Sequence, residues 1–273
     1  MSGIVAVLAT GGRVLDAREL SALRASVRAH SKTPAKQWID ALVALASLSG
    51  AVETLGPPEP SLAAVPSLDL VCTFEGQLHN SAELRADLGG ASSDQAHSDL
   101  ALQAYARWGE TFVGRLRGDF ALVIWDARLK RLVCARDPIG IKALYLYKTA
   151  CSFIVASDLA FLLTLCEQAV PINPKAVAAY LSGDPLTTDT FYAGVAKLPQ
   201  GLVVSAHDGS QRTFRHWRVS DIKPVRYTRS EDYADHFRNV FFDAIRCRLS
   251  GARRTVGSSI RVSGPGHLIR YQS

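Results

Sequence analysis

The chain begins Met-Ser-Gly, and its second residue has the groups needed for chemistry of its own. Removal of the initiator Met before a small residue would leave Ser2 with a free α-amine beside its hydroxyl. In that layout the amine can serve as the base that activates the hydroxyl as a nucleophile. Met-Ser-Gly is also a common start for an ordinary cytosolic protein. Ser2 is therefore a candidate nucleophile that the rest of the chain must support.

The cysteines are not spaced like a metal-binding or redox motif. The five of them are odd in number and widely spaced, and most lie in apolar, strand-like runs; they are Cys72, Cys134, Cys151, Cys166 and Cys247. No CxxC pair suggests a zinc site or a redox pair, so they are predicted to be reduced core residues, and no metal site is predicted.

Length and composition indicate a globular protein. The chain has 273 residues, of which 48% are hydrophobic and 21% charged. The longest apolar runs, such as FALVIW, end well before the ~20 residues that a membrane span requires. The N-terminus lacks the basic and apolar regions of a secretion signal. We expect a cytoplasmic protein without a membrane partner.

Positive charge is concentrated near the C-terminus. The net charge is +6, and residues 212–273 hold thirteen Lys or Arg against five Asp or Glu, an excess of eight. The first 211 residues therefore carry about −2. A nucleic-acid interface would interleave basic with aromatic residues on a defined face or show a known motif, and neither is visible. No nucleic-acid partner is predicted.

Local patterns predict both strands and helices before residue 219. Apolar, β-branched runs predict strands at 3–9, 69–76, 120–126, 131–137, 152–158 and around 201–217. Helices are expected from a capping box at Asp16 and Glu19, after Pro34, and at 80–88, 98–116 and 176–183. The helix after Pro34 would bury Trp38, Leu42, Leu45 and Leu48. The proline-rich stretch 53–67 is expected to be an irregular loop.

Five motifs carry a resemblance to a known family. RDPIGIKALYLY (136–147) resembles the RDPxGxKPLYY signature of asparagine synthetases, and RLRGDFALVIWD (115–126) is similar to the strand that enters it. FEGQLHNSAEL (74–84) resembles FNGEIYNxxEL. Ser98 and Asp99 stand where that family has Ser-Asp, and TFYAGVAKLPQGLVV (190–204) resembles its closing motif. Because the five occur in the correct order, residues 1–218 are identified as a class II glutamine amidotransferase domain of this family.

The resemblance implies an α+β fold of the Ntn-hydrolase type, a four-layer αββα sandwich with two stacked antiparallel sheets. It also implies the site. Ser2 stands at the position of the family's nucleophilic cysteine, and Glu75 replaces the asparagine that donates to the oxyanion. Gly76 and Asp99 match family positions, whereas Gln77 replaces a glutamate. A carboxylate at Glu75 would repel the negative charge that develops on the substrate.

A further departure concerns glutamine binding. The family holds the glutamine α-carboxylate with an arginine that precedes the FNGEIYN strand, but this chain has no arginine from Ala29 to Leu84. Lys32 and Lys36 offer charge without the bidentate fork. We expect a degenerate, structural domain, as in lasso-peptide cyclases and β-lactam synthetases. The alternative is an active glutaminase that uses Ser2, with the activity of an asparagine synthase.

The rest of the chain resembles only the start of the family's synthetase domain. We expect a linker at 219–230 and an amphipathic helix that opens a truncated domain at 231–273. Ser263 and Gly264 are followed by Pro265, without the Asp-Ser of an ATP-pyrophosphate loop. No cofactor is expected for this chain. ATP and magnesium, and a small-molecule or peptide substrate, would belong to a missing synthetase domain, and the exposed helix predicts self-association.

Overall fold

The computed structural model describes residues 3–30, 35–48, 61–90, 95–166, 168–184, 186 and 188–249. The described residues up to 226 form one compact unit, and those from 227 onward belong to another. Ser2, Lys32 and the predicted tail at 250–273 lie outside the described residues. None of the helices in the described ranges is long and apolar enough to cross a membrane.

Two antiparallel sheets of six strands form the first unit. Sheet A has the order β10 (Val195–Lys197), β8 (Tyr145–Lys148), β9 (Ser152–Ala156), β1 (Gly3–Ala9), β3 (Val43–Leu48) and β2 (Lys36–Ile39). Sheet B has the order β12 (Ser210–Arg215), β11 (Leu202–His207), β7 (Arg131–Arg136), β6 (Gly118–Asp126), β5 (Leu70–Leu78) and β4 (Ser61–Val65). Every pairing between named strands is antiparallel among the described residues, as predicted.

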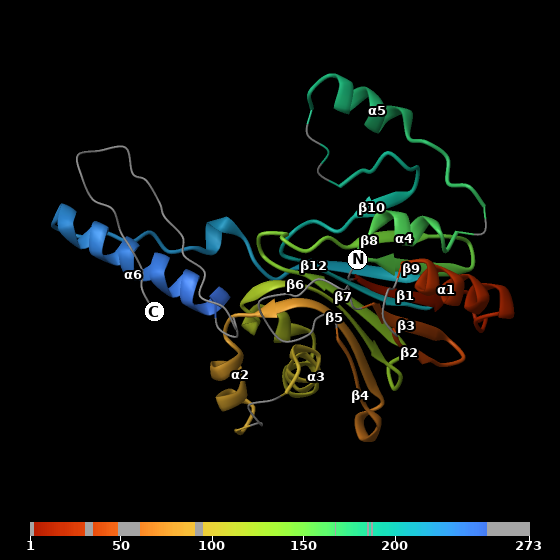
Figure 1. The fold of residues 1–273 in the computed structure, drawn as a ribbon, viewed down its shortest axis with the longest axis horizontal. Coiled ribbons are helices and arrows are strands. Elements are labelled where there is room, and N and C mark those ends of the chain that lie inside the picture. The colour runs from red at the N-terminus through yellow and green to blue at the C-terminus, as the bar shows by residue number, and fades with distance from the viewer. Residues whose placement is uncertain are drawn as a thin grey trace. The chain divides into compact units, whose positions relative to one another are not determined.

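The two sheets stack face to face, with helices on each outer face (Figure 1). Alternate side chains of β1 face different cores, because successive residues of a strand point to opposite sides. Ile4 packs with Trp125 of sheet B between the sheets. Val5 packs with Leu23 of α1 (Ala17–His30) and Phe161 of α4 (Leu159–Leu163). The outer face of sheet B is covered by α2 (Ser81–Asp87), α3 (His97–Trp108) and the 3-10 segment Gly109–Arg115. The αββα sandwich implied by the resemblance is confirmed.

The predicted capping box starts α1. The Asp16 carboxylate accepts hydrogen bonds from the backbone N–H groups of Glu19 at 2.8 Å and Arg18 at 2.8 Å. The Glu19 carboxylate in turn accepts from the Asp16 N–H at 2.9 Å. Three backbone donors that the first helical turn leaves free are thereby satisfied. The helix α5 (Pro174–Leu181) was also predicted, and Asn173 caps it by accepting from Ala176 N.

Two predictions between 34 and 67 are wrong. The residues expected to form a helix after Pro34 form the hairpin β2–β3, in which Trp38 pairs with Leu45. All six residues of β3 are buried because β3 lies between β1 and β2 in a sheet covered on both faces. Pairing with β1 therefore overrides the helix preference of its Ala and Leu residues. The end of the expected loop, Ser61–Val65, is the edge strand β4, whose register aligns Ala63 with Cys72.

The second unit contains the predicted C-terminal helix, α6 (Ser230–Leu249). Within it, the rings of Phe237 and Phe241 stack with centroids 5.9 Å apart. Ahead of the helix, the Tyr227 N–H donates to the Tyr233 hydroxyl at 2.9 Å.

The segment expected to be a linker, 219–230, includes a 3-10 turn, Val219–Asp221, which belongs to the first unit.

Candidate functional site

Three of the predicted site residues are consecutive on strand β5. In sheet B, where β5 lies between β6 and the edge strand β4, Glu75 pairs with Ala121, Gly76 with Phe120 and Gln77 with Asp119 of β6. Period-two alternation places Glu75 on the same face as Thr73, whose hydroxyl reaches the Ala46 carbonyl of sheet A at 3.4 Å. Glu75 therefore faces the space between the two sheets.

Glu75 forms an ion pair that the sequence did not predict. Its Oε1 lies 3.2 Å from Nζ of Lys142, and Glu75 is only 7% exposed. The second oxygen, Oε2, is buried and has no hydrogen-bond partner in the described part of the chain. A buried carboxylate oxygen without a donor is costly, which makes this atom a point where a ligand or another group would bind favourably.

Lys142 is held in place by the first two residues of the RDPIGIK segment. Asp137 is fully buried and accepts backbone N–H groups from Ile139 at 3.0 Å, Ile141 at 3.0 Å and Lys142 at 3.0 Å, and also from Gly140. The Arg136 guanidinium donates to the carbonyl groups of Leu198, Lys142 and Gly140, the first at 2.7 Å.

Burial lowers the pKa of the Arg136 guanidinium, against the opposing effects of Asp137 and Tyr145. This carboxylate and this guanidinium convert the loop after β7 into a rigid turn, because they satisfy the backbone polar groups that sheet pairing leaves free. The side chain of Lys142 leaves from the end of this turn.

Gly76 is required by the backbone. Its φ is +121°, and a Cβ placed there would lie 1.9 Å from the carbonyl oxygen of Asp119. No side chain fits at that distance from a neighbouring strand, so the match to the family at this position has a structural cause.

Asp99 lies in the first turn of α3, in the helical layer on the outer face of sheet B. Its neighbour His97 packs against Phe74, with ring centroids 5.8 Å apart. Phe74 and Glu75 point to opposite faces of β5, so Asp99 approaches the strand from the side that Glu75 does not face. No hydrogen bond or ion pair joins Asp99 to Glu75, Gly76 or Gln77 among the residues described.

The start of α3 also carries buried polar atoms. Nε2 of His97 and Oγ of Ser98 have no hydrogen-bond partner within the described ranges. Burial, with smaller effects from Arg85 and His79, lowers the pKa of His97 to about 4. His97 is therefore neutral at physiological pH and acts as a packed, uncharged ring.

The structure thus brings Glu75, Gly76 and Gln77 together and adds Lys142, while Ser2 lies outside the described residues. Gly3, the next residue, begins β1, and the Ile4 N–H donates to the Ser157 hydroxyl at 3.0 Å. Lys36, considered as a substitute for the missing arginine, is exposed on the edge strand β2. Sequence reasoning missed Lys142, although it lies in the quoted motif, because its contact with Glu75 joins positions that are 67 residues apart in the chain.

Residues 1–217 match the family described as "Glutamine amidotransferase domain". The chain belongs to this family. The glutamine amidotransferase domain accounts for the first compact unit, and the predicted Ntn-hydrolase fold is confirmed by solved structures. The glutamine phosphoribosylpyrophosphate amidotransferase from B. subtilis has a TM-score of 0.53 and 14% identity, covering 79% of this chain and 49% of that one.

Several curated proteins are similar over part of their length. A putative glutamine-hydrolyzing asparagine synthetase of Mycobacterium bovis is 35% identical over 140 residues, which are 48% of this chain and 21% of that protein. Asparagine synthetase 1 of Bacillus subtilis is 27% identical over 183 residues, 64% of this chain and 28% of that protein. The amidase chry2 of Gibberella zeae is 28% identical over 181 residues, 64% of this chain and 26% of that protein. The matched part is thus at most about a third of these relatives.

Proposed function

We propose that this glutamine amidotransferase domain does not hydrolyse glutamine and instead supports a synthetase as a structural domain. The ion pair between Glu75 and Lys142 is the observation that carries the proposal. At the position where the resemblance requires an amide donor, the chain has a buried carboxylate, and the nearby ammonium is already bound to it.

The electrostatics of this pair oppose glutamine hydrolysis. An oxyanion needs donors that are free to point at it, and loss of one donor typically reduces the rate by about a hundredfold or more. Lys142 balances the charge of Glu75 but directs its cation at Oε1. Ser2 adds a weaker nucleophile than a thiol, and no arginine from 29 to 84 is available for the glutamine carboxylate. These departures all act on the same reaction.

In this proposal the synthetase is a further part of a protein that is longer than this domain, as the curated relatives are. Curated relatives of which this chain spans 21–36% bear the name asparagine synthetase. In this proposal ATP and magnesium serve the synthetase portion, which activates a carboxylate on a small molecule or peptide, as in lasso-peptide cyclases and β-lactam synthetases. Within the described ranges, no group of three His, Cys, Asp or Glu residues could hold a metal ion.

We also propose that this protein is located in the cytoplasm.

The test is a glutaminase assay on a series of variants. Intact mass first establishes whether Met1 is removed, since only then does Ser2 carry a free amine. The purified chain is then incubated with glutamine, and glutamate is measured for the natural chain, Ser2→Ala, Ser2→Cys and Ser2→Cys combined with Glu75→Asn. Glu83→Gln, which alters an exposed ion pair with Arg117, is the matched control.

We expect no glutamate above the Ser2→Ala background for the natural chain or for Ser2→Cys alone, because Glu75 still occupies the donor position. The double variant is expected to gain at most slow turnover. Glutamate production by the natural chain that disappears in Ser2→Ala would instead establish the alternative, an active amidotransferase with Ser2 as its nucleophile.

A further inference from the structure

A pocket lies on the outer face of sheet A, on the side of the sheet away from Glu75. Its volume is about 320 Å³, near the lower end of the range for small-molecule sites. Its lining includes Val7, Glu19, Cys151, Ile154, Leu165 and Cys166. Val7 and Ile154 point toward the helices, whereas Glu75 faces the space between the sheets. The pocket is therefore distinct from the candidate glutamine site and independent of the proposed function.

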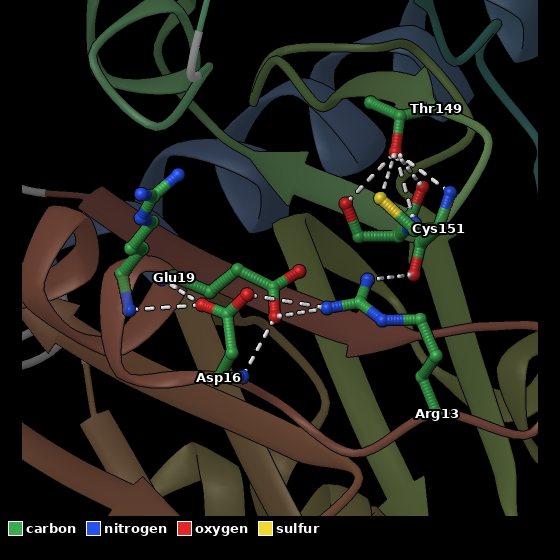
Figure 2. A network of polar contacts seen from close by, with 7 residues as sticks. Arg13, Asp16, Glu19, Thr149 and Cys151 are labelled. Carbon is green, nitrogen blue, oxygen red and sulfur yellow. Dashed lines mark hydrogen bonds and ion pairs between the residues drawn. The ribbon is translucent and has the colours of Figure 1, made fainter.

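One oxygen of Glu19 remains available to this pocket. The Glu19 side chain is 10% exposed, and its Oε2 accepts from the Asp16 N–H at 2.9 Å and from Arg13 Nη2 at 3.4 Å. In Figure 2 the other carboxylate oxygen makes no hydrogen bond or ion pair with the residues drawn, and it lies on the side of the network that faces Thr149 and Cys151. One oxygen of Glu19 thus caps α1, while the other is a free acceptor.

The opposite wall of the pocket is a turn whose own polar groups are already used. The Thr149 hydroxyl accepts from Cys151 N at 3.3 Å and Ser152 N at 2.9 Å, and donates to the Ser152 carbonyl at 3.1 Å. Arg13 Nη1 donates to the Cys151 carbonyl at 3.3 Å (Figure 2). The turn is rigid and offers a ligand little hydrogen bonding.

The chemistry of the lining selects the charge of a ligand. Glu19 is the only acidic or basic side chain among the described residues that line the pocket. Arg13 pairs with both Glu19 and Asp16, so these three side chains together carry a net charge of −1, which favours a cation over an anion. A metal ion is not favoured, because the described residues contain no group of three His, Cys, Asp or Glu suited to hold one. Val7, Ile154 and Leu165 provide an apolar surface beside the carboxylate.

We propose that this pocket binds a small organic ammonium ion with an apolar body. The ammonium group donates to the free oxygen of Glu19 in a charge-assisted hydrogen bond. The apolar body packs on Val7, Ile154 and Leu165. A neutral molecule of the same shape gains the packing but lacks the charge.

The experiment uses 3-methylbutylamine as the probe and 3-methylbutan-1-ol as its neutral counterpart. The full chain at pH 7.5 is treated with iodoacetamide at increasing probe concentration, and the alkylation of each cysteine is measured by peptide mass spectrometry. Occupancy of the pocket shields Cys151, whereas Cys247 of α6 serves as an internal reference. We expect saturable protection of Cys151 by the amine, at about a tenfold lower concentration than by the alcohol.

Two variants test the origin of this preference. Glu19→Gln keeps a capping-box acceptor for the Asp16 N–H but removes the charge, so the amine is expected to protect no better than the alcohol. Glu83→Gln on α2 is the control and leaves protection unchanged. Cys166→Phe places a larger side chain in the pocket and leaves residue 19 unchanged. The amine is then expected to cause no further decrease in Cys151 alkylation, which keeps the test decisive if Glu19→Gln does not fold. Equal protection by amine and alcohol, or amine protection that survives Glu19→Gln, would overturn the proposal.

Discussion

Replacement of Gly76 by alanine tests whether this glycine is fixed by the backbone. The new Cβ would lie 1.9 Å from the Asp119 carbonyl oxygen, more than 1 Å inside the 3.0 Å limit that real Cβ atoms respect. The φ of +121° adds strain of about 1–3 kcal/mol for an L-residue. Displacement of the β5–β6 pair at Gly76 adds about 1–3 kcal/mol, the usual range for overpacking. We expect a total loss of roughly 2–6 kcal/mol.

Gly209→Ala provides the matched control. Gly209 also has a positive φ, +76°, but it lies in the turn between β11 and β12, and no atom stands within 4 Å of the position that its Cβ would take. It therefore experiences the conformational strain without the steric clash. Its expected loss is about 1–2 kcal/mol.

Urea denaturation at pH 7 measures the free energy of unfolding of both variants, and thermal denaturation at the same pH measures their Tm. In a domain of this size, a loss of 1 kcal/mol lowers Tm by about 2–4 °C, so Gly76→Ala should melt roughly 10 °C below the natural chain. The decisive quantity is the difference between the two glycine variants. Equal losses would refute the reasoning, since they would mean that the close approach of Asp119 contributes nothing.

Three further predictions concern other parts of the chain. Asp137→Asn turns amide donors toward backbone N–H groups and is expected to lower the free energy of unfolding by about 3 kcal/mol; a loss below about 1 kcal/mol in urea would contradict the role of the turn. Because burial lowers the pKa of His97 from 6.5 to about 4, its contribution is complete above pH 6.5 and is lost as the pH falls toward 4. The loss is on the order of 3 kcal/mol, and His97→Gln should flatten this part of the stability–pH curve. Removal of residues after Asp221 deletes a helix in which Phe237 is largely exposed, so sedimentation velocity should show less self-association than in the full chain.

How well the sequence predicted each element depended on whether the interactions that determine it lie close together in the chain. The cap of α1 depends on Asp16 and Glu19, three residues apart, and the sequence was sufficient to predict it. Strand β1 is apolar over its whole length and contains the β-branched residues Ile4, Val5 and Val7, which is also a local signal. Strand β3, VALASL, has Ala and Leu spacing that fits a helix equally well. Only its pairing with β1, which aligns Ala6 with Leu45, decides its state.

The same distinction holds at the candidate site. Glu75, Gly76 and Gln77 were found because a short motif contains all three. Lys142 was missed because its contact with Glu75 depends on the turn that Asp137 closes, and no spacing rule links the two segments. Likewise, nothing in the sequence around Glu19 indicated that one of its oxygens would face a pocket lined by Cys151.

The residues that carry the family resemblance and those that carry its chemistry are largely different sets. Arg136 and Asp137 match the family signature because they satisfy the backbone groups of a buried turn, and Gly76 matches because a neighbouring carbonyl excludes any side chain. These demands persist whether or not the domain hydrolyses anything. Glu75 is not held by such a backbone demand in the described residues, where the one polar contact of its carboxylate is the ion pair with Lys142. The motifs therefore indicate the fold, and whether the domain hydrolyses glutamine has to be measured at Glu75 and at Ser2, as the glutaminase assay does.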